Sequence, residues 1–377
     1  MRMLLGAIAL AATVAHGPAR ADQLQTLYQS PAHQRIQAFA QDGQLLAWFE
    51  PGTKVRPCNL VWVWQLGHAK ETLPAQGSRY HNVTCQWDVP AASPVGLAIA
   101  GNLGAPEVLW TLRESASHVV KFDYVVGATI KDPRERRFQQ VAHTRHGAGL
   151  WLGGLAGSGT TLVYSVVDVR YHDQVACLSS PKSAHACDLD VAGGGIYRIV
   201  GRRPPAPVKN AGPAVGLAVS GDDVAYLAPA SAALKDGRPL TSADVPIVIR
   251  NAGTGVPVAS IAPDGTPLAI GLSDTVLAVL GSTPDGLVLS WYAHDTGRLL
   301  HSMRVPKTTA PELAVGSETI VYRDGLEIRA VDVRSNRVKT LAKASSTPIG
   351  LSISDGRVAW AENVGGRGRI RAIDVPY

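Results

Sequence analysis

A short pattern recurs seven times along this chain of 377 residues. In each copy, a turn containing Gly or acidic residues is followed by an apolar segment that usually ends in Trp or Tyr. The apolar segments are residues 45–48, 108–110, 162–164, 224–226, 276–278, 320–322 and 358–360, and the fifth ends in Ala278 instead of an aromatic residue. Regular self-similarity is typical of repeat architectures, so this pattern constrains the fold more than any single motif.

A second segment, rich in Gly, Ala and Ser, comes just before each of these turns. In six of the seven units a proline lies at or near its start, most clearly at Pro94, Pro213, Pro267, Pro311 and Pro348. Proline at the first residue of a strand removes no ladder hydrogen bond. Small side chains are what the innermost strands need where several sheets converge on one axis. We therefore expect these segments to be the inner strands of a propeller.

Each unit continues into a second hairpin, for example 287–293 with 298–305, and 326–333 with 337–342. The two hairpins predict four short antiparallel strands per unit. The last unit ends at residue 377 after its third strand, whereas residues 24–31 resemble the missing fourth one. Pairing the two ends would remove an exposed sheet edge. The sequence thus predicts an all-β fold, a seven-bladed β-propeller over residues 22–377, closed by an N-terminal strand that completes the last blade.

The turn Ser354-Asp355-Gly356 followed by Val358-Ala359-Trp360 is similar to the Pro-Asp-Gly-x-x-Ile-Ala-Phe element of TolB-type repeats. The chain therefore resembles the TolB-like and WD-repeat-like seven-bladed β-propellers of exported bacterial proteins, over nearly all of residues 22–377. It lacks the Trp-Ser-Pro that usually precedes the TolB turn and the Gly-His and Trp-Asp pairs of true WD repeats. The resemblance implies the fold, and one fold hosts many functions.

Residues 1–21 have the composition of a secretory signal peptide. Arg2 precedes an apolar run over residues 4–15, which is followed by Gly17-Pro18 and then by Ala19-Arg20-Ala21. The run is too short for a permanent membrane helix, which needs about 20 residues. We expect cleavage after Ala21 and a secreted or periplasmic protein without a transmembrane segment.

The net charge of +6 includes two arginines of this leader, Arg2 and Arg20, so the mature chain carries +4. The densest basic clusters, residues 134–137 and 201–203, are short. Nucleic-acid-binding proteins concentrate Lys and Arg on one face or helix. We therefore expect no nucleic-acid partner, and we expect a monomer.

Four cysteines in an exported chain allow three pairings. Proximity in the sequence favours Cys58 with Cys85, and Cys177 with Cys187. The second bridge would pin a polar, turn-rich segment. No Cys-x-x-Cys spacing is present, and an oxidising compartment favours disulfides over metal-bound thiolates.

Motifs for common chemistry are missing from the sequence. Gly157-Ser158-Gly159 has the wrong spacing for a Gly-x-Ser-x-Gly nucleophile, and the Gly-rich stretches lack the Lys and helix of a phosphate loop. No motif indicates a bound cofactor. His143 and His146, with His33 on the equivalent connection of another unit, are the weak candidates for a metal site at the channel mouth. A catalytic metal would need about three such ligands.

Aspartates recur in register at Asp42, Asp223, Asp274 and Asp355, with Asp332 and Asp374 on third strands. Asp in a tight turn bonds its own backbone two residues on, so we expect a structural role for them. The leading hypothesis is a non-catalytic, exported binding or scaffold module for a protein or cell-envelope partner. The alternative is a polysaccharide lyase or glycosidase with its site at the channel mouth, which would depend on the histidines.

Overall fold

The computed structural model describes residues 23–53, 58–73, 84, 93–101, 107–114, 120–144, 147–179, 188–201, 203–230, 241–306 and 312–375. These residues form an all-β structure with one short helix, α1 (Gln174–Ser179). Within the described ranges, no helix is long and apolar enough to span a membrane.

Among the described residues, antiparallel strands form five separate four-stranded sheets, each ordered from an inner to an outer strand. The first contains β2 (Ala38–Asp42), β3 (Leu45–Glu50), β4 (Leu60–Gln65) and β5 (Glu71–Leu73). The next contains β14 (Gly216–Ser220), β15 (Asp223–Leu227), β16 (Ile247–Asn251) and β17 (Pro257–Ile261), and it is followed by β18 (Thr266–Leu272), β19 (Val276–Thr283), β20 (Gly286–Ala293) and β21 (Leu299–Val305). The fourth contains β22 (Leu313–Val315), β23 (Thr319–Asp324), β24 (Glu327–Asp332) and β25 (Val338–Lys343). The fifth is ordered β26 (Ile349–Ser354), β27 (Arg357–Val364), β28 (Arg367–Asp374) and β1 (Gln25–Gln29).

The strands expected for units two and three lie together in one eight-stranded sheet. It contains β6 (Ser93–Ala100), β7 (Glu107–Glu114), β8 (Val120–Thr129), β9 (Arg136–Thr144), β10 (Gly149–Ser158), β11 (Thr161–Tyr171), β12 (Leu189–Ile199) and β13 (Ala206–Pro207). The prediction of seven separate blades is therefore corrected to five separate blades and this double-width sheet.

A glycine explains why the two units join. Among the described residues, β9 and β10 pair at His143 and Gly149, and Gly149 has a φ of +127°. A Cβ at residue 149 would lie 2.5 Å from the carbonyl oxygen of Ala142. Only glycine permits both this backbone conformation and this approach, so the outer strand of one unit meets the inner strand of the next.

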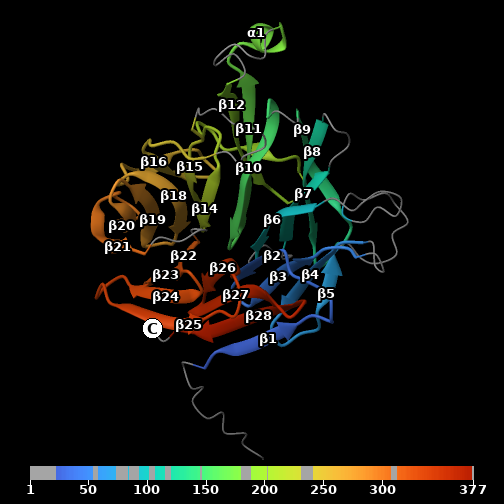
Figure 1. Cartoon of the computed structure of the whole chain (residues 1–377), viewed down its shortest axis with the longest axis vertical. Helices are drawn as coiled ribbons and strands as arrows, with labels where there is room; N and C mark the ends of the chain where they lie inside the picture. The colour runs from blue at the N-terminus through green and yellow to red at the C-terminus, as the bar shows by residue number, and fades with distance from the viewer. Residues whose placement is uncertain are drawn as a thin grey trace, which may run out of the picture.

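The innermost strands contact one another in a closed order, β2, β6, β10, β14, β18, β22, β26 and back to β2. They line a narrow central channel with a volume of about 260 Å³. Small residues are needed there, as expected: a Cβ at Gly153 would lie 1.9 Å from the carbonyl oxygen of Ala214 on the neighbouring inner connection. Figure 1 shows the sheets arranged around this axis, with β10–β12 projecting beyond the others toward α1.

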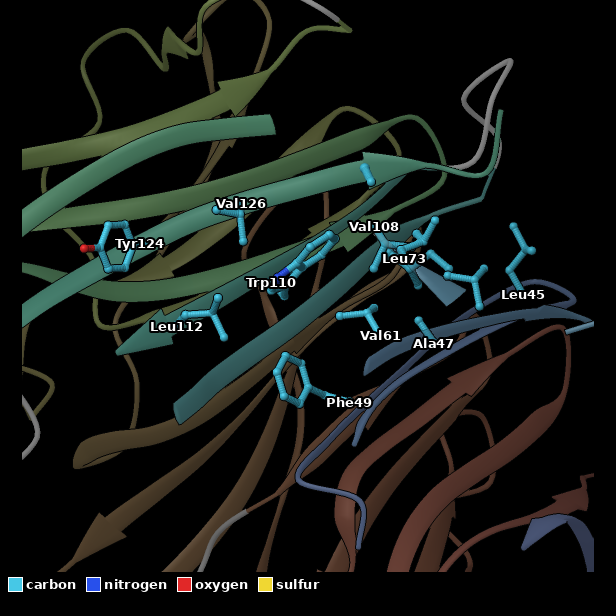
Figure 2. Packing of buried hydrophobic residues seen from close by; sticks show 13 residues of the cluster. Leu45, Ala47, Phe49, Val61, Leu73, Val108, Trp110, Leu112, Tyr124 and Val126 are labelled. Atoms are coloured by element: carbon cyan, nitrogen blue, oxygen red, sulfur yellow. The ribbon is translucent and has the colours of Figure 1, made fainter. Parts of the chain in front are cut away.

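The core lies between neighbouring sheets. Figure 2 shows Phe49 and Val61 from the first sheet facing Trp110 and Val126 from the double-width sheet, all with no exposed side-chain surface. The fifth repeat, which lacks its aromatic residue, fills the space differently. Ala278 lies opposite Trp291 on β20, and both are fully buried. The cross-strand neighbour therefore supplies the missing aromatic ring.

Strand β1 pairs with β28, from Gln25 opposite Ala372 to Gln29 opposite Arg369. The first described strand and the last three strands thus share one sheet. Tyr28 on β1 also donates a 2.8 Å hydrogen bond from its hydroxyl to Glu50 on β3. This carboxylate is buried and accepts further hydrogen bonds from the indole N–H groups of Trp48 and Trp62.

The expected signal peptide lies outside the described residues. Cys58 and Cys177 are described, and neither has a free thiol. Cys85 and Cys187, their expected partners, are not among the described residues, so the two pairings stay predictions.

Candidate functional site

The turns that join first and second strands surround a polar cavity at one end of the channel, with a volume of about 460 Å³. We call it the polar mouth. Its lining includes Asp42, Asp274, Glu318 and Asp355, together with backbone and hydroxyl groups from Ser158, Ser220, Ser273, Ser317 and Ser354. Glu318 is paired with Arg334 of the adjacent hairpin.

Asp42 holds three turns together. Its Oδ2 accepts hydrogen bonds from the backbone N–H of Gly101 at 2.6 Å and of Gly159 at 2.8 Å. Burial raises the pKa of Asp42; these two hydrogen bonds oppose the shift, and the nearby negative charge of Asp355 adds to it. The mouth thus places two carboxylates close enough to repel each other.

Further hydrogen bonds connect the remaining turns. The backbone N–H of Gly43 donates to the Ser354 hydroxyl at 2.7 Å, and Gln41 Nε2 donates to the carbonyl oxygens of Ser354 and Arg357. Thr275 donates its hydroxyl to the carbonyl of Ser317. Because these bonds cross from one sheet to the next, they fix the turns relative to one another.

His294 makes another of these links. Its Nδ1 lies 2.6 Å from the Ser273 carbonyl oxygen, and its Nε2 lies 3.0 Å from Asp223 Oδ2. Both neighbours are acceptors when the carboxylate is ionised, and a neutral imidazole has only one N–H. His294 therefore bridges the fourth and fifth repeats.

The histidines expected to share a site occupy different environments. His33 lies in an exposed turn between β1 and β2 and has a φ of +64°. His143, on β9, is only 3% exposed and stacks on the Trp151 ring with 3.6 Å between ring centroids. His146 lies outside the described residues. No three metal-ligating side chains come together within the described ranges.

His143 belongs instead to a buried ion-pair cluster within the double-width sheet. Its Nε2 lies 3.6 Å from Asp123 Oδ2, and Arg113 binds both oxygens of Asp123, at 2.7 and 3.0 Å. Burial alone would raise the pKa of Asp123, but the contacts with His143 and Arg113 outweigh it and lower the pKa. Sequence separation hid this cluster, because its members come from three strands.

The recurring aspartates divide into two groups. Asp332 behaves as the sequence predicts, since it accepts hydrogen bonds from the backbone N–H groups of Arg334 and Ser335 in its own turn. Asp42 and Asp223 bond other sheets instead, and Asp374 forms an ion pair with Arg357. The expectation of local turn bonding is therefore wrong for Asp42 and Asp223. For Asp374 it stays a prediction, because residue 376, two positions on, lies outside the described residues.

Comparisons with known proteins support the fold. No protein-family model matches the chain, and no curated protein matches its sequence. The chain is similar to the β-propeller domain of the trilobed protease from Pyrococcus furiosus, with a TM-score of 0.52, 10% identity, and coverage of 90% of this chain and 95% of that one. It is also similar to the WD40 domain of Toxoplasma gondii coronin, with a TM-score of 0.51, 10% identity, and coverage of 96% and 88%. At this identity the likeness establishes the class, a β-propeller.

Proposed function

We propose that this chain is an exported, non-catalytic β-propeller that binds a protein partner at the polar mouth. The observation that carries the proposal is the set of cross-sheet hydrogen bonds from Asp42, Gly43 and Thr275, which hold the turns around the cavity. A surface fixed before binding loses little conformational entropy when a partner docks.

The chemistry of the cavity indicates the kind of partner. Asp42, Asp274 and Asp355 face it, and the repulsion between Asp42 and Asp355 contributes to the raised pKa of Asp42. A Lys or Arg side chain placed between these carboxylates would relieve this repulsion. The partner is therefore a protein that presents basic side chains to the mouth.

We also propose that the ring has seven blades, with the double-width sheet counted as two and β1 as the closing strand. The closed contact order of the inner strands and the pairing of β1 with β28 support this count. Export is part of the same proposal. It rests on the composition of residues 1–21, and N-terminal sequencing of the native protein should then begin at Asp22.

An affinity capture from cell-envelope extract tests the partner proposal with two matched variants of the chain from residue 22. Asp274→Asn with Asp355→Asn removes two charges from the mouth. Asp244→Asn with Asp285→Asn removes two charges from connections between second and third strands, which lie at the opposite end of antiparallel sheets. We expect one stoichiometric protein to be retained by the wild type and the control and lost by the mouth variant. Equal capture by both variants would refute the mouth as the binding surface.

A further inference from the structure

A second cavity lies at the opposite end of the fourth and fifth repeats, where the inner strands β14 and β18 begin. Its volume is about 810 Å³, and among the described residues that line it none carries a charge. Its apolar part includes Leu217, Leu268 and Ile270, and its hydroxyl groups come from Thr241, Thr266 and Ser282. We call it the uncharged pocket.

A β-bulge turns Leu268 into this pocket. The pairing of β18 with β19 jumps from Pro267 opposite Gly281 to Ala269 opposite Leu280, so Leu268 has no partner in the ladder. It is 41% exposed despite lying on an inner strand. Bulges often redirect a side chain next to a binding site.

The walls around Leu268 are held by specific contacts. Ser242, at the base of the connection between β15 and β16, donates its hydroxyl to the carbonyl oxygen of Pro267. Gly281 on β19 allows the connection just before β18 to approach β19 closely, because a Cβ at residue 281 would lie 2.6 Å from the Asp264 carbonyl oxygen. The pocket is therefore built by the backbone as well as by side chains.

We propose that the uncharged pocket binds a neutral small molecule with an apolar body and a hydroxyl or carbonyl group. Pockets for small ligands have volumes of roughly 300 to 1,000 Å³, mainly apolar walls and a few polar groups that fix orientation. A charged ligand would lose its hydration without meeting an opposite charge among the described lining residues, which is costly. This proposal is independent of the polar mouth, because the two cavities share none of the described residues that line them.

Titration of the chain from residue 22 with N-phenyl-1-naphthylamine, a neutral probe that fluoresces in apolar surroundings, tests the proposal. We expect saturable binding of one probe per chain, with at least tenfold weaker binding of the anionic analogue 1-anilinonaphthalene-8-sulfonate. Leu268→Glu should weaken binding of the neutral probe at least tenfold. The matched control is Val95→Glu, since Val95 lies at the equivalent bulge of β6, is 52% exposed and does not line the pocket.

Ser282→Trp is a second variant, which should block the pocket sterically from its exposed rim. Near-ultraviolet circular dichroism verifies that each variant is folded. Three results would overturn the proposal: non-saturable uptake by the wild type, equal effects of Leu268→Glu and Val95→Glu, or equal affinity for the neutral and anionic probes.

Discussion

Replacement of Asp42 by Ala tests how the turns of the polar mouth are held. One carboxylate oxygen, Oδ2, accepts both hydrogen bonds from Gly101 and Gly159. Truncation removes the acceptor from both N–H groups, which belong to two different turns. Hydrogen bonds to a charged group contribute about 1.5 to 3 kcal/mol each. Water reaches this half-buried position, so the lower value applies and the free energy of unfolding should fall by about 3 kcal/mol.

Asp42→Asn separates the acceptor from the charge. An amide oxygen can occupy the position of Oδ2 and accept both bonds through its two lone pairs. The amide also removes the unfavourable burial of a charge and the repulsion by Asp355. We therefore expect this variant to unfold within about 1 kcal/mol of the wild type at pH 7.

The pH dependence follows from the direction of the pKa shift. Because the pKa of Asp42 is raised in the folded state, ionisation there costs more than in the unfolded chain. The wild type should lose stability relative to Asp42→Asn as the pH rises from about 4 toward 7, and the two should converge below about pH 4.

Urea unfolding, followed by the fluorescence of buried tryptophans such as Trp48 and Trp110, measures these differences. Asp285→Ala, at an exposed ion pair with Arg304, is the control and should change stability by less than about 1 kcal/mol. If Asp42→Ala changed stability no more than this control, the bridging role of Asp42 would be refuted. If Asp42→Asn lowered the free energy of unfolding as much as Asp42→Ala, the negative charge of Asp42 rather than its hydrogen-bond acceptor would be responsible.

Three further predictions concern the packing of the core, the stability of the chain at low pH and the attachment of strand β1. Trp291→Ala should destabilise the chain by about 3 to 5 kcal/mol in urea unfolding, because Ala278 opposite it cannot fill the cavity. A small loss of stability would contradict the idea that Trp291 replaces the aromatic ring missing at residue 278. Because the pKa of Asp123 is lowered in the folded state, its ionised carboxylate contributes stability that is present above about pH 4 and is lost as the pH falls. The melting temperature of Asp123→Asn should therefore fall less steeply from pH 5 to 2.5 than that of the wild type. An unchanged slope would contradict this prediction. Tyr28→Phe should speed hydrogen exchange in residues 25–29 by roughly tenfold, since its hydrogen bond to Glu50 ties β1 to β3, and unchanged exchange would count against that link.

Much of the fold could be predicted because it is encoded in local patterns. The apolar segment before Trp360 and the small-residue segment after Pro348 became β27 and β26, and the other units behave alike. Turn glycines and strand periodicity act over a few residues, so one sequence is enough to detect them. The sequence also shows that Ala278 replaces the usual aromatic residue in the fifth unit. That Trp291 supplies an aromatic ring in its place depends on the register between β19 and β20, which the sequence alone does not give.

The remaining features depend on contacts between distant residues. The joined sheet results from one close approach at Gly149, and nothing near that residue distinguishes it from a turn glycine. The sequence identifies Asp42 as a turn residue, but its hydrogen-bond partners are 59 and 117 positions away. His143 is one of three weak metal candidates in the sequence, yet Asp123 and Trp151 lie against it in the structure. Helix α1 overlaps only the first two residues of the polar, turn-rich segment between Cys177 and Cys187, and the sequence analysis does not predict it.

Site-specific photo-cross-linking in native envelope extract tests the central claim, that the polar mouth binds a protein partner. A photoreactive amino acid replaces Asp274 at the mouth in one variant and Asp244 at the opposite end in the other. We expect position 274 to cross-link to one protein through a peptide containing Lys or Arg, and position 244 not to cross-link to it. Cross-linking of the same protein from position 244 alone would place the binding surface at the other end of the propeller and refute binding at the polar mouth.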